Sequence, residues 1–508
     1  MNKKNNLFTK KTTLINIISN LMLQIVTLIS GFIVPKIILI YFGSNVNGLI
    51  SSINQFLSYI TLVEGGITGV ISASLYKPLV DRNFKKVSSI INTSNNFYRK
   101  IGIFYIAYSF AVGLIYPIFV KTDFSYTYVF SLTLILSLNL LIQYMFSLSL
   151  RNLLNADKKL YLVSFTQIAV IIIGLILSLI CVKIYPNIHF FKLINGLLFL
   201  LQPIVYSKYI NKNYEINKLA PIDNELIKNR WNGFAINIAA FIHFSTDISI
   251  LTIFTNLKIV SVYSVYSLVT MGLKTIITSI SSGINPTIGQ LYAKGNEDVT
   301  LNKFLIYEFV LILSVYYLFC IAGLLITPFI MIYTAGISDA NYYQPLFGIL
   351  LLISEALYLV KLPHLNLAYS ANKFKEITKP AFIEAGLNII ISIVLVRKIG
   401  LCGIVIGTII GMLYRMIFQV EFTKQLLKKY KSFNFYKRNI IFALCSIVGL
   451  IICIFCLPKV QFTIRSWLEM AFLYSIIFCL LYFFCGVLFF DKEMKELYNY
   501  FKIYRKEK

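Results

Sequence analysis

LYLVSFTQIAVIIIGLILSLICV, residues 160–182, is an apolar stretch that contains no charged side chain. A helix needs about 20 mainly apolar residues to cross the hydrocarbon core of a membrane, and this stretch is long enough. Its apolar residues do not alternate with polar ones, as they would in a barrel strand. Only helices and closed barrels satisfy every backbone hydrogen bond inside lipid. The stretch therefore predicts a transmembrane helix.

Comparable apolar stretches occur along the whole chain on both sides of this one. Together they predict an all-α integral membrane protein with about 14 transmembrane helices. The predicted spans are residues 14–35, 47–75, 101–120, 127–150, 160–182, 191–210, 231–255, 260–290, 304–333, 343–369, 377–396, 402–423, 439–457 and 467–490.

The composition agrees with a protein that lies in lipid. Hydrophobic residues make up 58% of the 508-residue chain and charged residues 13%, whereas soluble domains carry about 25% charged residues. The net charge of +26 would indicate a nucleic-acid partner in a soluble protein, but here the basic residues lie between apolar stretches, so none is expected. The eight cysteines lie in or beside apolar stretches and indicate neither a disulfide framework nor a metal site.

The positions of Lys and Arg predict the orientation of the helices. If the N-terminal side is the inner side, the inner segments hold 35 of the 47 Lys and Arg residues and the outer segments hold nine. Cytoplasmic loops of membrane proteins carry such an excess of positive charge. Both termini are therefore predicted to be cytoplasmic, and an odd number of spans would destroy the pattern.

Two halves of the chain share landmarks at nearly one offset. Gly48 and Tyr263 open corresponding spans 215 residues apart, and the endings that begin at Leu75 and Leu291 are 216 residues apart. The inner loops 154–158 and 369–373 are again 215 residues apart. Landmarks at one offset indicate a parallel internal repeat, which is common in transporters.

The repeat and the polar stretch after the sixth span predict how the chain is divided. Each half of the repeat supplies six spans, and two spans follow outside it. The predicted parts are a six-helix lobe in residues 1–210, a cytoplasmic linker in 211–229, a six-helix lobe in 230–432, and two additional helices with a basic cytoplasmic tail in 433–508.

Three long stretches resemble one known family. They are YITLVEGGITGVISASLYKPLVDRNFKK (59–86), STDISILTIFTNLKIVSVYSVYSL (245–268) and SANKFKEITKPAFIEAGLNIIISIVLVRKIGLCGIVIGT (370–408). The chain is similar over nearly its whole length to the polysaccharide-repeat-unit flippases (Wzx-type oligosaccharide transporters). Their superfamily also holds the multidrug exporters and the lipid II flippases. The resemblance implies a V-shaped bundle of two lobes around a central cavity.

The resemblance also implies a cargo, partners and a location. The cargo would be an oligosaccharide unit on a polyprenyl pyrophosphate, moved from the inner to the outer leaflet of the bacterial cell membrane for capsule, O-antigen or exopolysaccharide assembly. Membrane lipid, a polysaccharide polymerase and glycosyltransferases are the implied partners, and a monomer is expected. No phosphate-binding glycine loop occurs, so ATP hydrolysis and a cofactor are not expected.

Charged residues inside the predicted spans are the candidates for function, because charge in hydrocarbon is costly. Lys274 and His243 lie at similar distances along the chain from the outer loop at Lys258, so both are expected near mid-membrane. Asp247 is one helical turn from His243. These residues predict a polar cluster that contacts cargo or couples an ion, or else an internal ion pair that fixes two neighbouring helices.

A second candidate lies in the tenth span. Lys361 is followed closely by Pro363, and a proline inside a helix kinks it and frees a carbonyl group. A kink beside a buried cation is a candidate pyrophosphate site or gate. The other interpretation is a structural kink in which Lys361 pairs with Glu355 or another acid.

Two further charged residues and two glycine ridges complete the candidates. Arg415 is a candidate for cargo contact or for a side chain that snorkels to the inner surface. Glu64, like Asp247 and Glu355, is a candidate for ion coupling. Small residues at four-residue spacing predict close helix packing; they are Gly65, Gly69 and Ala73 in one span and Gly403, Gly407 and Gly411 in another.

Two other functions stay open from the residues alone. An exporter of drugs or of lipid II would share the same spans and repeat. A membrane glycosyltransferase or polymerase would need a sizeable outer loop with convergent carboxylates. The outer loops are short, and their acids are confined to Asp123 and Asp339, so a non-enzymatic transporter is favoured.

Overall fold

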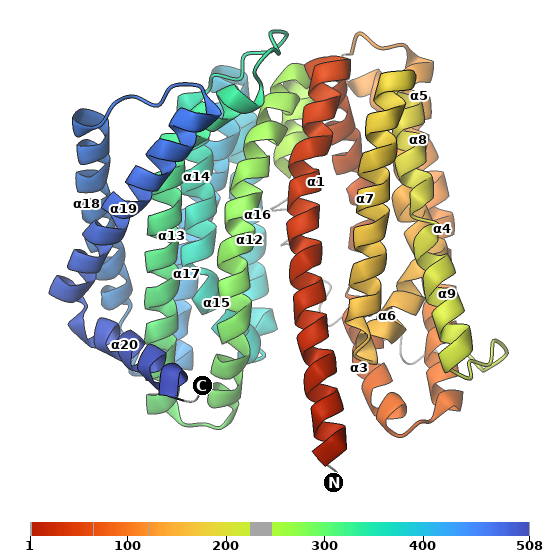
Figure 1. Cartoon of the computed structure of the whole chain (residues 1–508), viewed down its shortest axis with the longest axis horizontal. Helices are drawn as coiled ribbons and strands as arrows, with labels where there is room; N and C mark the ends of the chain where they lie inside the picture. Colours follow the sequence, from red (N-terminus) through yellow and green to blue (C-terminus); the bar gives the residue numbers. More distant parts are fainter. Residues whose placement is uncertain (1–2, 65, 121, 224–245, 507–508) are drawn as a thin grey trace. The chain divides into compact units, whose positions relative to one another are not determined.

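The computed structural model describes residues 3–64, 66–120, 122–223 and 246–506, and their regular structure is helical throughout. The chain divides into two compact units. Unit 1 contains Met1–Phe241 and Asn256–Ser261, and unit 2 contains Ile242–Thr255 and Val262–Lys508. The predicted all-α fold is confirmed (Figure 1), whereas the finer lobe and linker boundaries stay a prediction.

The helices of unit 1 run up and down the bundle in chain order. They are α1 (Lys3–Ser58), α2 (Thr61–Glu64), α3 (Ile67–Val80), α4 (Phe84–Phe119), α5 (Tyr126–Ile142), a π-helical turn (Gln143–Ser147), α6 (Leu148–Ala156), α7 (Leu160–Ile184), α8 (Ile188–Leu198) and α9 (Leu201–Asn213). Their hydrophobic core includes Leu49, Ile53 and Ile71, which are completely buried.

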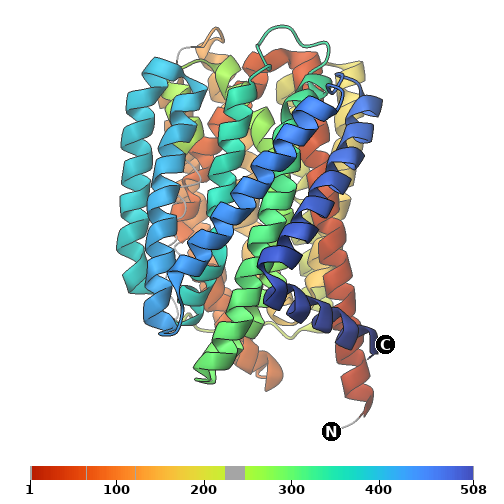
Figure 2. The same ribbon diagram turned by 90° about the vertical axis from the view of Figure 1, so that its left-hand side faces the viewer.

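Unit 2 contains the remaining helices. They are α12 (Leu257–Ala293, whose first residues belong to unit 1), α13 (Glu297–Tyr333), α14 (Pro345–Val360), α15 (Leu362–Ser370), α16 (Phe374–Ile399), α17 (Leu401–Leu426), α18 (Ser432–Cys456), α19 (Ile464–Phe489) and α20 (Asp491–Lys506). The additional pair α18 and α19 packs against α13 (Figure 2). The predicted basic tail begins as the helix α20.

Local chemistry explains where several predicted spans break. Gly43 has a φ of 79°, which a residue with a side chain rarely adopts, and it kinks α1 between the first two predicted spans. The second span breaks again before Gly66, whose φ is also 79°. The predicted kink in the tenth span is confirmed, because α14 ends at Val360 and α15 begins just before Pro363.

The turns between helices have the same backbone features at corresponding positions of the two halves of the chain. Asn83 caps α4 by accepting a hydrogen bond from Lys86 N, and Asn296 caps α13 by accepting one from Val299 N. Lys158 and Asn372 both take a positive φ, 58° and 56°, immediately after α6 and α15. Equivalent caps and turns at nearly one offset support the parallel repeat.

Twelve helices in the described residues are long and apolar enough to cross a membrane. One of them, Leu14–Glu64, holds the first predicted span and the larger part of the second on either side of the Gly43 kink. The predicted span 231–255 lies mostly outside the described residues, and only 246–254 is seen as helix. The chain is therefore a multi-pass membrane protein.

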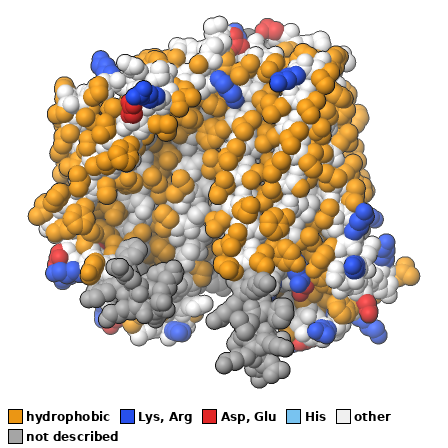
Figure 3. All heavy atoms as spheres, in the orientation of Figure 1, with side chains coloured by type: hydrophobic (Ala, Val, Ile, Leu, Met, Phe, Trp, Pro, Cys, Tyr) orange, Lys and Arg blue, Asp and Glu red, His pale blue; other side chains and the backbone are white. Residues whose placement is uncertain are grey.

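Large hydrophobic side chains cover the outside of these helices. Ile103, Phe455 and Leu488 expose 62%, 81% and 74% of their surface. On the face in Figure 3, hydrophobic side chains fill the middle of the helices, and charged side chains gather near the helix ends. Lipid solvates such a surface, whereas water would not.

Candidate functional site

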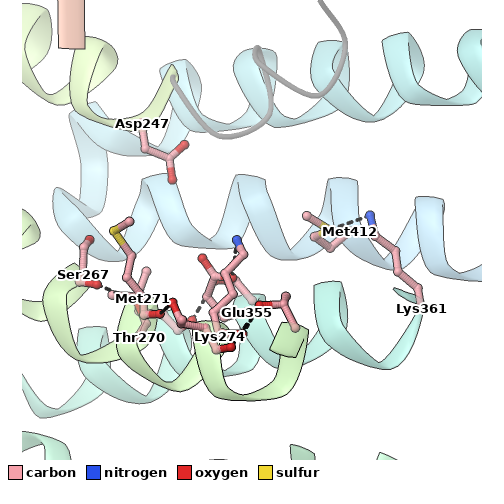
Figure 4. A network of polar contacts seen from close by, with 12 residues as sticks. Asp247, Ser267, Thr270, Met271, Lys274, Glu355, Lys361 and Met412 are labelled. Carbon is pink, nitrogen blue, oxygen red and sulfur yellow. Dashed lines mark hydrogen bonds and ion pairs between the residues drawn. The ribbon is translucent and has the colours of Figure 1, made fainter. Parts of the chain in front are cut away.

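Lys274 lies on α12 and pairs with a carboxylate of α14. Its Nζ is 3.0 Å from Oε2 of Glu355, and the two side chains keep 19% and 21% of their surface exposed. The Lys274 ammonium also lies 4.3 Å from the centre of the Tyr358 ring, a cation–π contact. This pair joins two helices of unit 2 (Figure 4). Its side chains are more exposed than those of the buried ion pairs of Lys361, Arg415 and Glu308 described below.

Asp247 is buried in a group of oxygen atoms. Its Oδ2 accepts a hydrogen bond of 2.9 Å from Tyr263 and lies 3.2 Å from Oγ1 of Thr408. The same Thr408 hydroxyl is 3.3 Å from Oδ1 of Asn388 and 3.3 Å from the carbonyl oxygen of Ile404. His243, the predicted neighbour of Asp247, lies outside the described residues. Asp247 therefore bonds to Tyr263 on α12 and Thr408 on α17, while Lys274 pairs with Glu355 on α14.

Lys361 and Arg415 share a single acid that the sequence interpretation did not name. Lys361 Nζ is 3.5 Å from Oε1 of Glu384, and Arg415 Nε is 3.8 Å from Oε2 of the same side chain. All three side chains are at most 6% exposed. Lys361 thus pairs with Glu384 and not with Glu355, and one carboxylate faces two cations.

Burial decides between the interpretations of Arg415. A snorkelling side chain would carry its guanidinium to the surface, but Arg415 is only 4% exposed. Its Nη1 atom has no hydrogen-bond partner among the described residues. The snorkelling interpretation was wrong, because Glu384 on the adjacent helix α16 holds the guanidinium inside the unit. Lys361 is also 3.0 Å from the sulfur of Met412, one turn before Arg415 on α17.

Glu64 stands apart from these groups. It is the last residue of the short helix α2 in unit 1, at the break before α3, and it is partly buried. Nearby, Tyr98 bonds to Thr68 and accepts a hydrogen bond from Asn152. The structure therefore places Glu64 beside a polar group of unit 1, whereas the other candidates described here lie in unit 2.

The two glycine ridges have different roles. A Cβ atom on Gly403 would lie 2.5 Å from the carbonyl group of Leu395, and one on Gly407 would lie 2.8 Å from the backbone nitrogen of Ser392. This ridge therefore packs α17 directly on the α16 backbone, as predicted. Gly69 has open space around it, so the prediction of close packing at Gly69 was wrong. Gly65 lies outside the described residues.

A second buried cluster was not predicted at all. Glu308 on α13 is completely buried, and its Oε1 accepts from Arg438 Nη1 at 2.7 Å. Its Oε2 accepts from the Tyr430 hydroxyl at 2.8 Å and is 3.4 Å from His364 Nε2. Arg438 also pairs with Glu493 of α20. Intramembrane charge alone would have identified Glu308 and Glu384, since both lie inside predicted spans.

Comparison with known proteins identifies structures that share this fold. No protein-family model and no curated protein matches the chain. Among solved structures, the lipid II flippase MurJ in an inward closed conformation superposes with a TM-score of 0.68 at 16% identity, covering 91% of this chain and 99% of that chain. The MATE multidrug transporter DinF-BH gives a TM-score of 0.62 at 14% identity and covers 83% and 97% of the two chains.

A third similar structure extends the same group. It is an inward-facing multidrug resistance MATE family transporter of the MOP superfamily, with a TM-score of 0.58, 14% identity, and 80% and 96% of the two chains covered. These similar structures are of transporters and a flippase, not of enzymes. Identities this low establish the fold alone, and the chain has the helical fold shared by the lipid II flippase and the MATE transporters.

Proposed function

We propose that this chain is a flippase that moves a polyprenyl-pyrophosphate-linked oligosaccharide repeat unit from the cytoplasmic to the outer leaflet of a bacterial inner membrane. Both termini would be cytoplasmic, and the chain would act as a monomer beside glycosyltransferases and a polysaccharide polymerase. The observation that carries the proposal is the cluster in which Lys361 and Arg415 face the one carboxylate of Glu384. Its excess of positive charge suits a pyrophosphate, which cannot enter hydrocarbon unaided.

The likeness to the lipid II flippase supports a lipid-linked cargo. That match covers 91% of this chain, whereas the two MATE transporters cover 83% and 80%. The three resembling stretches favour a repeat unit over lipid II. The alternative function is export of drugs or of lipid II. The complementation test described below distinguishes this alternative from transport of a repeat unit.

Lys274 is the proposed first contact of the pyrophosphate, because its side chain keeps 19% of its surface exposed. Cargo would draw Lys274 away from Glu355, while the break at Lys361 between α14 and α15 would let the buried cations reach the anion. In a strain deleted for its own repeat-unit flippase, this chain is expected to restore surface glycan. Lys274→Ala is expected to lower the restored amount roughly 10- to 100-fold, since a hydrogen bond to a charged group contributes about 1.5–3 kcal/mol.

A double variant separates cargo contact from helix fixing. If Lys274 only fixes α12 to α14, Lys274→Ala combined with Glu355→Ala will recover activity, because neither charge is left unpaired. If Lys274 contacts cargo, the double variant stays inactive although the protein is present in normal amounts. Lys424→Ala, which breaks an exposed ion pair with Glu421, is the matched control. Failure of the native chain to restore glycan would direct attention to the other cargoes.

Asp247 is the proposed ion-coupling residue, and the oxygen atoms around it support this role. A carboxylate, the Thr408 hydroxyl, the Asn388 amide oxygen and the Ile404 carbonyl gather there, and hard cations prefer oxygen ligands. We expect Asp247→Asn to abolish the dependence of transport in inverted vesicles on an imposed sodium or proton gradient. Thr408→Val distinguishes the two ions, because a hydroxyl can ligate sodium but is not needed to hold a proton.

The gradient measurement has two decisive controls. Glu355→Gln and Glu64→Gln test the other two coupling candidates in the same vesicles. If Asp247→Asn keeps the full response to both gradients while one of these variants loses it, the residue changed in that variant, and not Asp247, couples the ion.

A further inference from the structure

Unit 1 contains a cavity of about 910 Å³ that is lined by the first half of α4 and by α9. Helix α4 begins and α9 ends at the end of the unit where the N-terminus lies (Figure 1). The cavity walls come from α4, the π-helical turn, α9 and the segment that follows α9. The cavity extends along α4 as far as Arg99, just before the uncharged stretch 101–119 of that helix. It therefore lies where a helix leaves the hydrocarbon for the polar surface of a membrane.

The wall of this cavity has a cationic part and an apolar part. Arg99, Lys208 and Lys218 line it together with several asparagines, and none of the described residues in the lining is acidic. Within the described ranges, these three cations form no ion pair with an acidic side chain. Phe146 and Ile204 line the other part and are 47% and 49% exposed. A ligand that fits both parts carries negative charge at one end and hydrocarbon at the other.

The segment after α9 is fixed, so the cavity is already formed. Asn92 donates to the carbonyl groups of Asn217 at 3.0 Å and Ala220 at 3.1 Å. Ser89 donates to Pro221 O at 2.7 Å. We call residues 214–223 the strap, since these bonds hold them across α4.

Two more bonds complete the attachment of the strap to α4. Asp223 N donates to Thr93 Oγ1 at 2.8 Å, and Lys86 pairs with the Asp223 carboxylate at 2.8 Å. Leu219 at the turn of the strap leaves 92% of its surface exposed. An apolar side chain directed outward beside a cationic cavity is expected of a segment that rests among lipid headgroups.

We propose that this cavity binds an anionic phospholipid of the adjacent leaflet. The lipid phosphate would be held by Arg99, Lys208 and Lys218, and an acyl chain would lie against Phe146 and Ile204. Guanidinium and ammonium groups are the usual partners of phosphate oxygens. The lipid would pack between α4, α9 and the strap, and so it would stabilise unit 1. The site is independent of the proposed cargo cluster, which lies in unit 2.

The test uses the full chain purified in a neutral detergent. Phosphatidylglycerol and phosphatidylcholine are added separately, and the melting temperature and the amount of lipid retained after washing are measured. Phosphatidylglycerol is expected to raise the melting temperature by several degrees and to be retained, unlike phosphatidylcholine. The triple variant R99Q/K208Q/K218Q is expected to need roughly 100-fold more phosphatidylglycerol for the same effect, since each of the three basic residues near anionic lipid adds to binding.

A matched triple variant shows whether the position of the charges matters. K77Q/R82Q/K85Q removes the same number and kind of exposed cations from the same end of unit 1, outside the cavity lining. It is expected to respond to phosphatidylglycerol as the native chain does. An equal loss in the two triple variants would overturn the proposal in favour of diffuse electrostatic attraction. Equal melting temperatures without lipid show that the variants are folded.

Two further arms distinguish a lipid from a free anion. Ile204→Ser changes only the apolar wall and is expected to weaken phosphatidylglycerol binding. Inorganic phosphate at the same concentration is expected to give no rise in melting temperature. If inorganic phosphate reproduces the full rise and Ile204→Ser has no effect, the cavity is an anion site and the proposal of a lipid fails.

Discussion

Gly403→Ala and Gly407→Ala are each expected to destabilise the folded protein, although each adds only one methyl group. The added Cβ on Gly403 would lie 2.5 Å from the Leu395 carbonyl carbon and oxygen, and that on Gly407 would lie 2.8 Å from the Ser392 backbone nitrogen and 2.9 Å from the Asn388 carbonyl oxygen. Backbone atoms cannot rotate away, so α17 must separate from α16 over part of its length. Overpacking of this kind costs about 1–3 kcal/mol, and valine at either position should prevent folding.

Separation of α16 from α17 would also disrupt the two polar groups of unit 2. Asn388 and Glu384 lie on α16, while Thr408 and Arg415 lie on α17, so both polar groups are assembled across the ridge. The melting temperature in detergent, measured with the fraction that elutes as a single species, is the first readout. Loss of stability and of glycan restoration should therefore occur together.

Gly386→Ala is the matched control for the ridge. It lies on α16 too, but a Cβ there meets nothing within 4 Å. Alanine should be neutral or slightly stabilising at this position, because glycine is the poorer helix former. If Gly386→Ala and Gly407→Ala lower the melting temperature equally, the close approach of the two backbones is not what fixes α17.

The glycine ridge also shows how much of the helix packing can be predicted from the sequence. Small residues at four-residue spacing predict close packing, and this holds for Gly403 and Gly407 but not for Gly69. The pattern states which face of a helix could admit a neighbour, but it does not state whether a neighbour is there. Span positions were predictable for a different reason: lipid imposes a length and an apolar composition on every crossing helix.

The charged residues of the candidate site could be predicted from the sequence, but the pairs that they form could not. Lys274, Lys361 and Asp247 were identified because charge inside a span is rare. Their partners could not be deduced, because the register between two helices decides which acid meets which cation. Glu384 holds Lys361 because α16 lies against the break between α14 and α15, a tertiary fact. The strap over α4 is likewise set by hydrogen bonds between residues more than 100 positions apart.

Glu308→Leu is expected to be the most destabilising single change outside the glycine ridge. Glu308 is completely buried and accepts from Arg438 Nη1 at 2.7 Å, so its removal leaves a buried guanidinium with Glu493 as its remaining acid. Breaking a buried pair from one side costs about 3–5 kcal/mol. Because Arg438 belongs to α18 and Glu493 to α20, the expected consequence is loosening of the C-terminal helices from α13. Limited proteolysis in the connection 427–431 and the melting temperature both report it.

The double variant Glu308→Leu with Arg438→Met shows whether charge or shape holds these helices. Apolar residues of similar volume can replace a buried ion pair with little loss of stability, and the partly exposed Glu493 side chain can turn to water. We therefore expect the double variant to recover most of the lost stability and to protect the connection again. Glu469→Ala, which breaks the exposed pair with Arg465, should change the unfolding free energy by at most about 0.5–1 kcal/mol. A double variant as unstable as Glu308→Leu would mean that the hydrogen bond from Tyr430 to Glu308, rather than the charge balance, attaches these helices to α13.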